Sequence, residues 1–185
     1  MNQPSLRLLM WVLMLAVISA CSKPQDTSTP DALAKSAFQA LVKNDVEAYK
    51  RLMIGKDDLP DVKRQVVAKA KSDISDPKKL EEKLAEFEKE FVKLEDKMGE
   101  MIADNVESFH KTRGKAEKQY MDWNNAEFGG VEYKIREHRD GVKQSDIYFF
   151  VKSKDKLYRF KLDDCLELKR GWVNGDGLRY RRAQN

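Results

Sequence analysis

The spacing of apolar and polar residues divides the chain into three parts. Residues 8–18 form an unbroken apolar run of 11 residues. From residue 30 to residue 111 apolar side chains recur at the three- and four-residue steps of an amphipathic helix, and from 128 to 182 they alternate with polar ones, as in a half-buried strand. Helices followed by strands predict an α+β fold, with N-terminal helices that include one long amphipathic helix, and then a curved antiparallel sheet.

Local start and stop signals divide the helical part, 30–111. Thr29 and Pro30 are typical of an N-cap and a first helical turn, and they predict a first helix from that point. Asn44, with Glu47 three residues later, has the spacing of a capping box and predicts a second, short helix. After a turn, a third helix is predicted over 61–74.

The most regular segment is a long helix that begins at Pro77 and need not end before Thr112. Its apolar residues are separated by alternating steps of four and three, the heptad spacing of a coiled-coil seam: Leu80, Leu84, Phe87, Phe91, Leu94, Met98 and Met101. At 1.5 Å per residue, residues 77–110 span about 51 Å and residues 61–74 only about 21 Å. The shorter helix therefore cannot cover the whole seam.

The part of the seam beyond that reach, from Phe91 to Phe109, must rest on another surface. That surface is the sheet of the same domain, a second copy of the chain, or a different partner protein. If a partner covers it, the predicted partner surface consists of Phe91, Leu94, Met98 and Met101.

Strand signals dominate from residue 128 onward. Asp140 and Gly141 are typical of a hairpin turn, residues 147–151 of a buried strand, and Lys154 with Asp155 of a second turn. Of the 17 aromatic residues, 11 lie from Tyr120 onward, which favours a sheet that curves around a core or a cleft. The residues predicted to line such a ligand cleft are Tyr148, Phe150, Tyr158, Phe160 and Trp172.

The N-terminal apolar run, residues 8–18, is followed closely by Cys21. Spanning a bilayer takes about 20 apolar residues, so the run is too short for a permanent membrane helix and fits the core of a cleaved signal. The last residue of the run and the three that follow it, Ile18-Ser19-Ala20-Cys21, resemble the lipobox of bacterial lipoproteins, in which a branched residue and two small ones precede the lipidated cysteine. An ordinary secretory signal with a chance cysteine is the alternative.

The lipobox resemblance implies a division of the chain and a location. Residues 1–20 would be a signal peptide, and Cys21 would carry three acyl chains in the membrane. Ser22 after the cysteine, where many inner-membrane lipoproteins have Asp, implies the periplasmic face of the outer membrane. Residues 21–29, the cysteine and the polar stretch after it, are predicted to be a flexible tether, whose residues 22–29 reach about 28 Å. Residues 30–185 are predicted to form one α+β domain.

Charge and cysteine content limit the classes of partner. The net charge is +4, and removal of residues 1–20, which hold Arg7 and no acid, leaves 34 basic and 31 acidic residues, or +3. The two signs are interspersed, which argues against a nucleic-acid surface. If Cys21 is lipidated, Cys165 has no disulfide partner and is either buried or reactive, and we expect it to be buried.

Catalytic and metal-binding patterns are sparse. His110 and His138 have no ligand spacing around them, and no nucleophile elbow, Walker loop, CxxC or HExxH motif is present. Asp163 and Asp164 lack the loop pattern of a calcium site, and residues 174–177 are typical of a tight turn. We expect no metal, no cofactor and no catalysis.

Two segments resemble the cystatin-like cone of the nuclear-transport-factor-two-like superfamily. One is 30–53, with Phe38, Leu41, Asn44, Asp45 and Tyr49, and the other is the pair of terminal hairpins around Trp172. The long helical segment 61–111 departs from the pattern of that superfamily. Its members include enzymes, binding modules and scaffolds, so the resemblance implies a fold and no particular activity.

The sequence leaves two functional hypotheses. The first is a lipid-anchored, non-catalytic periplasmic envelope protein that acts as an interaction or scaffold module, bound to the membrane through its lipid and to an envelope protein or a second copy through the long helix. The second is a carrier or sensor that binds a small ligand on the concave aromatic sheet. An exposed seam and a filled cone would favour the first, and a closed seam with an open cone the second.

Five cations cluster near the C-terminus: Lys169, Arg170, Arg179, Arg181 and Arg182. Their clustering has two interpretations. They could meet anionic lipid headgroups. The favoured interpretation is that they keep an edge strand soluble and discourage pairing between sheet edges.

Overall fold

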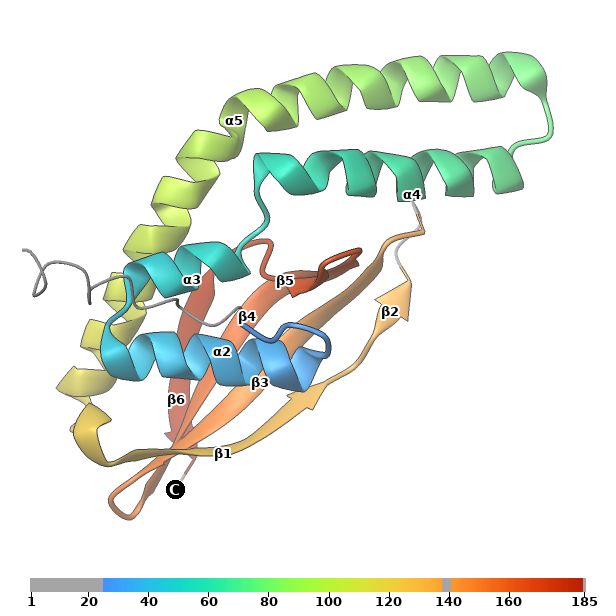
Figure 1. Ribbon diagram of the computed structural model, residues 1–185. Coiled ribbons are helices and arrows are strands. Elements are labelled where there is room, and N and C mark those ends of the chain that lie inside the picture. Colours follow the sequence, from blue (N-terminus) through green and yellow to red (C-terminus); the bar gives the residue numbers. More distant parts are fainter. Residues whose placement is uncertain (1–24, 138–140, 185) are drawn as a thin grey trace, which may run out of the picture.

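The computed structural model describes residues 25–137 and 141–184, and within them the predicted α+β fold is confirmed. In these residues four α-helices precede a six-stranded antiparallel sheet that curls into a half-barrel (Figure 1). The helices are α2 (Pro30–Lys43), α3 (Val46–Leu52), α4 (Leu59–Asp73) and α5 (Pro77–Lys118), with short 3-10 turns η1 (Lys56–Asp58) and η2 (Trp123–Asn125). The strands are β1 (Ala126–Tyr133), β2 (Arg136–Glu137), β3 (Lys143–Ser153), β4 (Lys156–Leu168), β5 (Gly171–Val173) and β6 (Leu178–Gln184).

Side-chain caps begin the first two helices. The Thr29 hydroxyl accepts a hydrogen bond from the Ala32 amide at 3.1 Å, which confirms the predicted start of α2. The predicted capping box at Asn44 is wrong by one residue: Asp45 caps α3, accepting from the Ala48 amide at 2.8 Å. Asn44 instead ends α2 in the left-handed conformation, with φ of 52°, which Asn tolerates better than most residues.

The long helix is longer than its minimum predicted length. α5 has 42 residues, which corresponds to about 63 Å, and it continues past Thr112 to Lys118. α4 runs antiparallel to the first half of α5, and the far ends of the two helices extend beyond the sheet (Figure 1). The start of α4 packs on the end of the sheet through Leu59, and Gln65 donates to the Glu167 carbonyl at 3.3 Å. An ion pair between Lys63 and Glu88 joins them. We call α4 together with residues 77–97 of α5 the arm.

The second half of α5 belongs to the body of the molecule. It contacts β6 and α3, and Phe109 stacks on Tyr49 with ring centroids 4.9 Å apart. Ser108 and Thr112 both donate hydrogen bonds to the carbonyl of Leu178, at 2.5 and 2.7 Å, so the start of β6 is held against the helix. One helix therefore connects the arm to the body without a break.

Strand pairing is antiparallel throughout, in the order β1-β3-β4-β5, with β2 on β3 and β6 on β4. Lys154, with φ of 56°, makes the predicted turn between β3 and β4. The register shifts where β1 has an extra residue between Phe128 and Gly130, and where β4 has one between Leu162 and Cys165. Such bulges bend a strand and increase its twist, which accounts for the curl.

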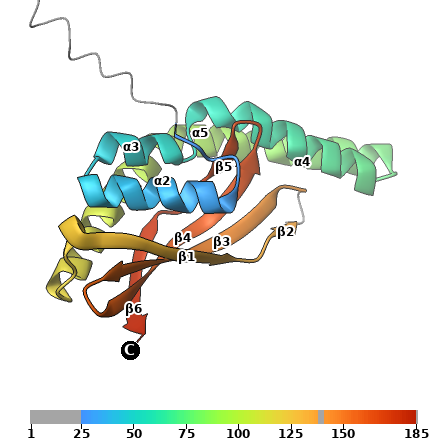
Figure 2. The ribbon, with the colours of Figure 1, turned by 60° about the horizontal axis from the view of Figure 1, so that its bottom comes forward.

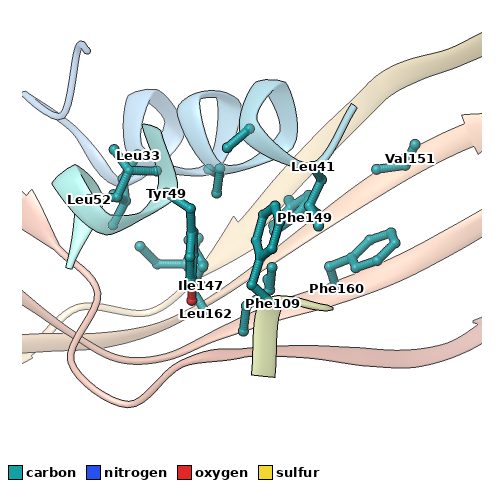
Figure 3. Packing of buried hydrophobic residues seen from close by; sticks show 14 of the residues in the cluster. Leu33, Leu41, Tyr49, Leu52, Phe109, Ile147, Phe149, Val151, Phe160 and Leu162 are labelled. Atoms are coloured by element: carbon teal, nitrogen blue, oxygen red, sulfur yellow. The ribbon is translucent and has the colours of Figure 1, made fainter. Parts of the chain in front are cut away.

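The core fills the space between the concave side of the sheet and the helices. α2 lies across β1 and β3, and aromatic and aliphatic side chains from both layers interdigitate below it (Figure 3). Fully buried members of this cluster are Leu33, Leu41, Tyr49, Phe109, Ile147, Phe149, Phe160 and Leu162. Their burial is the main apolar contribution to folding of this layer pair.

Residues 25–29, predicted to be part of a flexible tether, are fixed to the body. The Thr27 carbonyl accepts a hydrogen bond from the Trp172 amide at 2.6 Å, and its hydroxyl donates to the Arg170 carbonyl at 3.3 Å. The Ser36 hydroxyl donates to the Asp26 carbonyl at 2.9 Å. The tether prediction is wrong for these residues, because hydrogen bonds hold a polar segment that has no apolar period. We call 25–29 with these bonds the N-terminal clamp. The predicted signal peptide and Cys21 lie outside the described residues.

Candidate interaction surface

The five residues predicted to line one ligand cleft lie on two different faces of the sheet. Tyr158, Phe160 and Trp172 are buried in the core. Tyr148 and Phe150 flank the buried Phe149 and therefore point to the outer, convex face, because successive residues of a strand face opposite sides. The prediction of a single cleft lined by all five is wrong.

The inner face of the sheet is filled by its own side chains. Phe149 stacks on Phe160 with centroids 5.2 Å apart and lies 6.4 Å from the Phe128 ring. Trp123 contacts the same Phe160 ring at 5.9 Å. Phe149 and Phe160 have no exposed surface. The concave side is therefore a packed core at these positions, which speaks against the carrier hypothesis.

On the outer face of the sheet, the cations beside the aromatic rings form ion pairs with neighbouring carboxylates. The Arg159 guanidinium lies 4.1 Å from the Tyr148 ring centroid and 3.8 Å from the Glu132 carboxylate. Lys161 binds Asp146 at 3.0 Å and also pairs with Asp163. Burial is the largest single effect and opposes both charges, but hydrogen bonds and charge attraction together outweigh it. Asp163 and Asp146 raise the pKa of Lys161, and Lys161 with the Asp164 amide lowers the pKa of Asp146. These contacts stabilise a solvated sheet face.

The second half of the sheet contains a buried polar contact that fixes α3 to the chain after β5. The Asn174 amide donates to the Tyr49 hydroxyl at 2.9 Å, and the Cys165 sulfur lies 3.9 Å from the Asn174 side-chain oxygen. Cys165 is fully buried, as predicted. Burial raises the pKa of its thiol well above the usual value, so the thiol is neutral and a poor nucleophile.

Metal-binding groups do not gather in the described part of the chain: there, no three His, Cys, Asp or Glu side chains are placed to hold an ion. Asp163, compared above with a calcium ligand, and Asp176, of the predicted tight turn, both form ion pairs with Arg179, at 2.6 and 3.0 Å. His110 is exposed on α5, and its ring contacts that of Phe109. His138 and Asp140 lie outside the described residues.

The predicted partner surface on α5 divides at the point where the helix leaves the arm. Met98 has no exposed surface and packs in a second core cluster with Ile54, Leu59, Leu168 and Val173. Leu94 packs against that cluster, and Met101 is half-buried. Met98 is therefore not available to a partner, and its inclusion in the partner surface is wrong. Phe91 is half-buried and belongs to neither core cluster.

The accessible part of the seam lies nearer the tip of the arm. It comprises four half-buried residues, none of which belongs to the core clusters of the described chain: Leu80, Leu84, Phe87 and Phe91. We call these the arm seam. Next to them Val92 is 54% exposed. Heptad spacing identified the seam but missed Val92, which lies off the repeat.

The second half of the stripe rests on the body of the same domain, one of the three surfaces considered above, and the accessible residues lie on the half opposite α4. Residues beyond the reach of α4, such as Phe109, are covered by the sheet and α3, whereas residues opposite α4 keep exposed surface. The reason is geometric: one helix covers only one side of another, and a packed layer covers more. The predicted helix lengths could not indicate which half of the stripe stays exposed, because its burial depends on the surfaces that pack on α5 beyond the end of α4.

The cationic residues near the C-terminus separate into two groups. Lys169 and Arg170 lie at the β4–β5 turn, beside the N-terminal clamp. Arg179 and Arg181 lie on β6, opposite Lys161 and Arg159 of β4. The side chain of Arg182 is outside those described.

In residues 25–137 and 141–184 no helix is both long enough and apolar enough to cross a membrane. No protein family, curated protein sequence or solved structure matches the chain. The resemblances to bacterial lipoproteins and to the nuclear-transport-factor-two-like superfamily therefore stay predictions.

Proposed function

We propose that this protein is a lipid-anchored, non-catalytic interaction module of the bacterial envelope, held on the periplasmic face of the outer membrane. Its arm binds an amphipathic helical segment of a partner protein. The anchoring rests on the lipobox resemblance at residues 18–21. The docking role rests on the arm.

The observation that carries the docking role is the contrast between a filled sheet and a half-covered arm. Phe149 and Phe160 fill the concave face, while the arm seam retains exposed surface beside the exposed Val92. Apolar residues at steps of four and three fit the side chains of another helix, which would pack beside α4 and α5 as a third helix.

A non-catalytic role is supported by the burial of the thiol and by the ion pairs that the buried carboxylates form. The only cysteine of the described residues, Cys165, is buried and neutral. Buried carboxylates are paired with cations, as Asp58 is with Arg170 at 2.7 Å and Asp163 with Arg179 at 2.6 Å. Groups committed to structural ion pairs are poor candidates for general acid–base work.

Native mass spectrometry of the lipidated protein, gently extracted from its own membrane, tests the proposal. A stoichiometric partner protein should accompany the natural chain and be lost from the Val92→Glu variant. Lys93→Glu is the matched control, since Lys93 is an exposed neighbour off the seam and its change should leave the partner bound. Circular dichroism of each variant shows that the arm is still folded.

Two outcomes would contradict the proposal. A lone protein that carries a reproducible small mass beyond its lipid would favour the carrier hypothesis. A homodimer that Val92→Glu dissociates would show that the arm binds a second copy and not a partner.

A further inference from the structure

The N-terminal clamp leaves a short connection between the proposed anchor and the folded body. Gln25 is the first described residue, and Thr27 is already buried and hydrogen-bonded to Trp172. Between Cys21 and Gln25 stand only Ser22, Lys23 and Pro24. Four residue steps reach at most about 14 Å, which is half the reach of the tether predicted from the sequence.

That reach is small beside the dimensions of a bilayer and of the protein. The hydrocarbon layer is about 30 Å thick and the whole bilayer about 40–45 Å, so each headgroup layer is about 6 Å deep. About 8 Å of chain is then left beyond the headgroups. The 42-residue α5 alone is about 63 Å long. The body cannot turn its far side to the membrane on so short a connection.

Gln25 lies where three adjoining surface hollows meet. The largest, about 840 Å³, lies between α3, the start of α4 and the β4–β5 turn, and the other two, about 370 and 400 Å³, border α2. Gln25 lines all three. The surface around the end of the clamp is therefore the surface that the anchor holds nearest to the membrane.

Exposed side chains around these hollows are mainly basic. Six exposed cations line them: Lys35, Lys43, Lys50, Arg51, Lys169 and Arg170. We call these the basic rim. Six acidic residues line the same hollows. Of these, Asp26 and Asp57 are exposed, whereas Asp31, Asp45 and Asp61 are half-buried and Asp58 is buried against Arg170. The charge presented outward is complementary to phosphate.

We propose that the basic rim lies on the phosphate layer of the membrane, so that the N-terminal clamp makes the lipid anchor orient the protein as well as hold it. This inference rests on the lipid anchoring in the proposed function. α2 and α3 then face the bilayer, and the outer face of the sheet, with Tyr148 and Arg159, faces away from it. Figure 2 shows α2 and α3 on one side of the sheet and the end of β6 on the other.

Fluorescence quenching in liposomes tests the orientation. A dye is attached to a cysteine introduced at Gln39, which is exposed and lines two of the hollows, or at Lys152, which is exposed on the outer face of the sheet. Cys165 is buried and does not react with the dye. With a quencher on the lipid headgroups, the dye at Gln39 should be quenched severalfold more than the dye at Lys152. Anionic phospholipid should increase that ratio.

A glycine substitution releases the clamp. Gly171→Ala would place a Cβ 2.5 Å from the Thr27 carbonyl oxygen and 2.6 Å from its hydroxyl, which forces the segment off the body. The quenching ratio should then fall toward one. Gly130→Ala is the matched control, because Gly130 has a similarly positive φ, +132° against +114°, while its new Cβ would meet nothing within 4 Å in the described chain. It should keep the natural ratio.

A second variant tests the connection without touching the body. About 12 Gly and Ser residues inserted after Ser22 add about 19 Å of mean reach, and the ratio should again fall toward one. Equal quenching at both positions in the natural, lipidated chain would overturn the orientation and leave the anchoring intact. A chain whose mass shows no lipid on Cys21 would overturn both.

Discussion

The arm and the body share one helix and differ in how that helix is covered. Along α5 the same apolar stripe passes from Phe91, half-buried in the arm, to Phe109, which has no exposed surface in the body. The arm side is covered by one helix, and the body side by α3, β6 and the stacked ring of Tyr49. Heptad spacing therefore indicates that an apolar stripe exists and does not indicate how much of it is buried.

The two regions should differ most in how much free energy of unfolding is lost when a phenylalanine ring is removed. Phe109→Ala should lower the free energy of unfolding by about 3–5 kcal/mol, since it leaves a cavity beside Tyr49. Phe91→Ala should cost less than half as much, because its ring is already partly in water. Urea denaturation of the two variants measures this. Equal losses would show that the arm is as tightly packed as the body.

Buried polar contacts should matter next. Asn174→Ala removes the hydrogen bond to the Tyr49 hydroxyl and leaves that hydroxyl buried without its donor. A loss of about 1–3 kcal/mol in the free energy of unfolding is expected. The double variant Asn174→Ala with Tyr49→Phe should recover part of the loss, since both partners are then removed. No recovery in thermal or urea unfolding would mean that Asn174 acts through its packing alone.

The ion pairs of the sheet should make the stability of the body depend on pH. The lowered pKa of Asp146 contributes stability above its unfolded pKa of about 3.9, which is lost as pH falls through the folded value. The raised pKa of Lys161 contributes stability below its unfolded pKa of about 10.4, which is lost at higher pH. The natural chain should therefore exceed Lys161→Met in unfolding free energy most between about pH 4 and 10. A difference that stays constant down to about pH 2 would contradict this assignment.

The smallest effect is expected for the ion pair across the arm. Lys63 and Glu88 are both largely exposed, and exposed pairs contribute about 0.5 kcal/mol. The two side chains are replaced singly and together in a double-mutant cycle, and urea denaturation measures the free energy of unfolding of each variant. The coupling free energy between them should be of that size and should disappear in high salt. A coupling well above about 1 kcal/mol would mean that the arm depends on this pair more than on its seam.

Much of the fold could be predicted because the start of a helix and its apolar face depend on residues close together in the sequence. Thr29 and Pro30 begin α2 where their residue types predict, and the run from Pro77 forms one helix because apolar residues recur at helical spacing with no proline within it. The one-residue error at Asn44 arose because Asn serves equally as an N-cap and as a left-handed helix end, and only the backbone separates the two roles.

Prediction of the site was poorer because it depended on contacts distant in sequence. Tyr148 and Phe160 were expected to share a cleft, yet the β3–β4 register pairs Phe160 with Phe149 and leaves Tyr148 on the other face. A one-residue change of register would exchange the two faces. Met98 was expected at a partner surface and is covered by Leu59, Leu168 and Val173.

The order of elements, the start of α5 at Pro77, the apolar stripe along it and the cap that begins α2 follow from the sequence alone, because they depend on interactions within a few residues. Three features depend on the packing of distant segments: which part of the stripe stays accessible, which aromatic rings enter the core, and that residues 25–29 are held against Trp172. Burial and strand register are set by partners far along the chain, and their identity is not encoded in any local period.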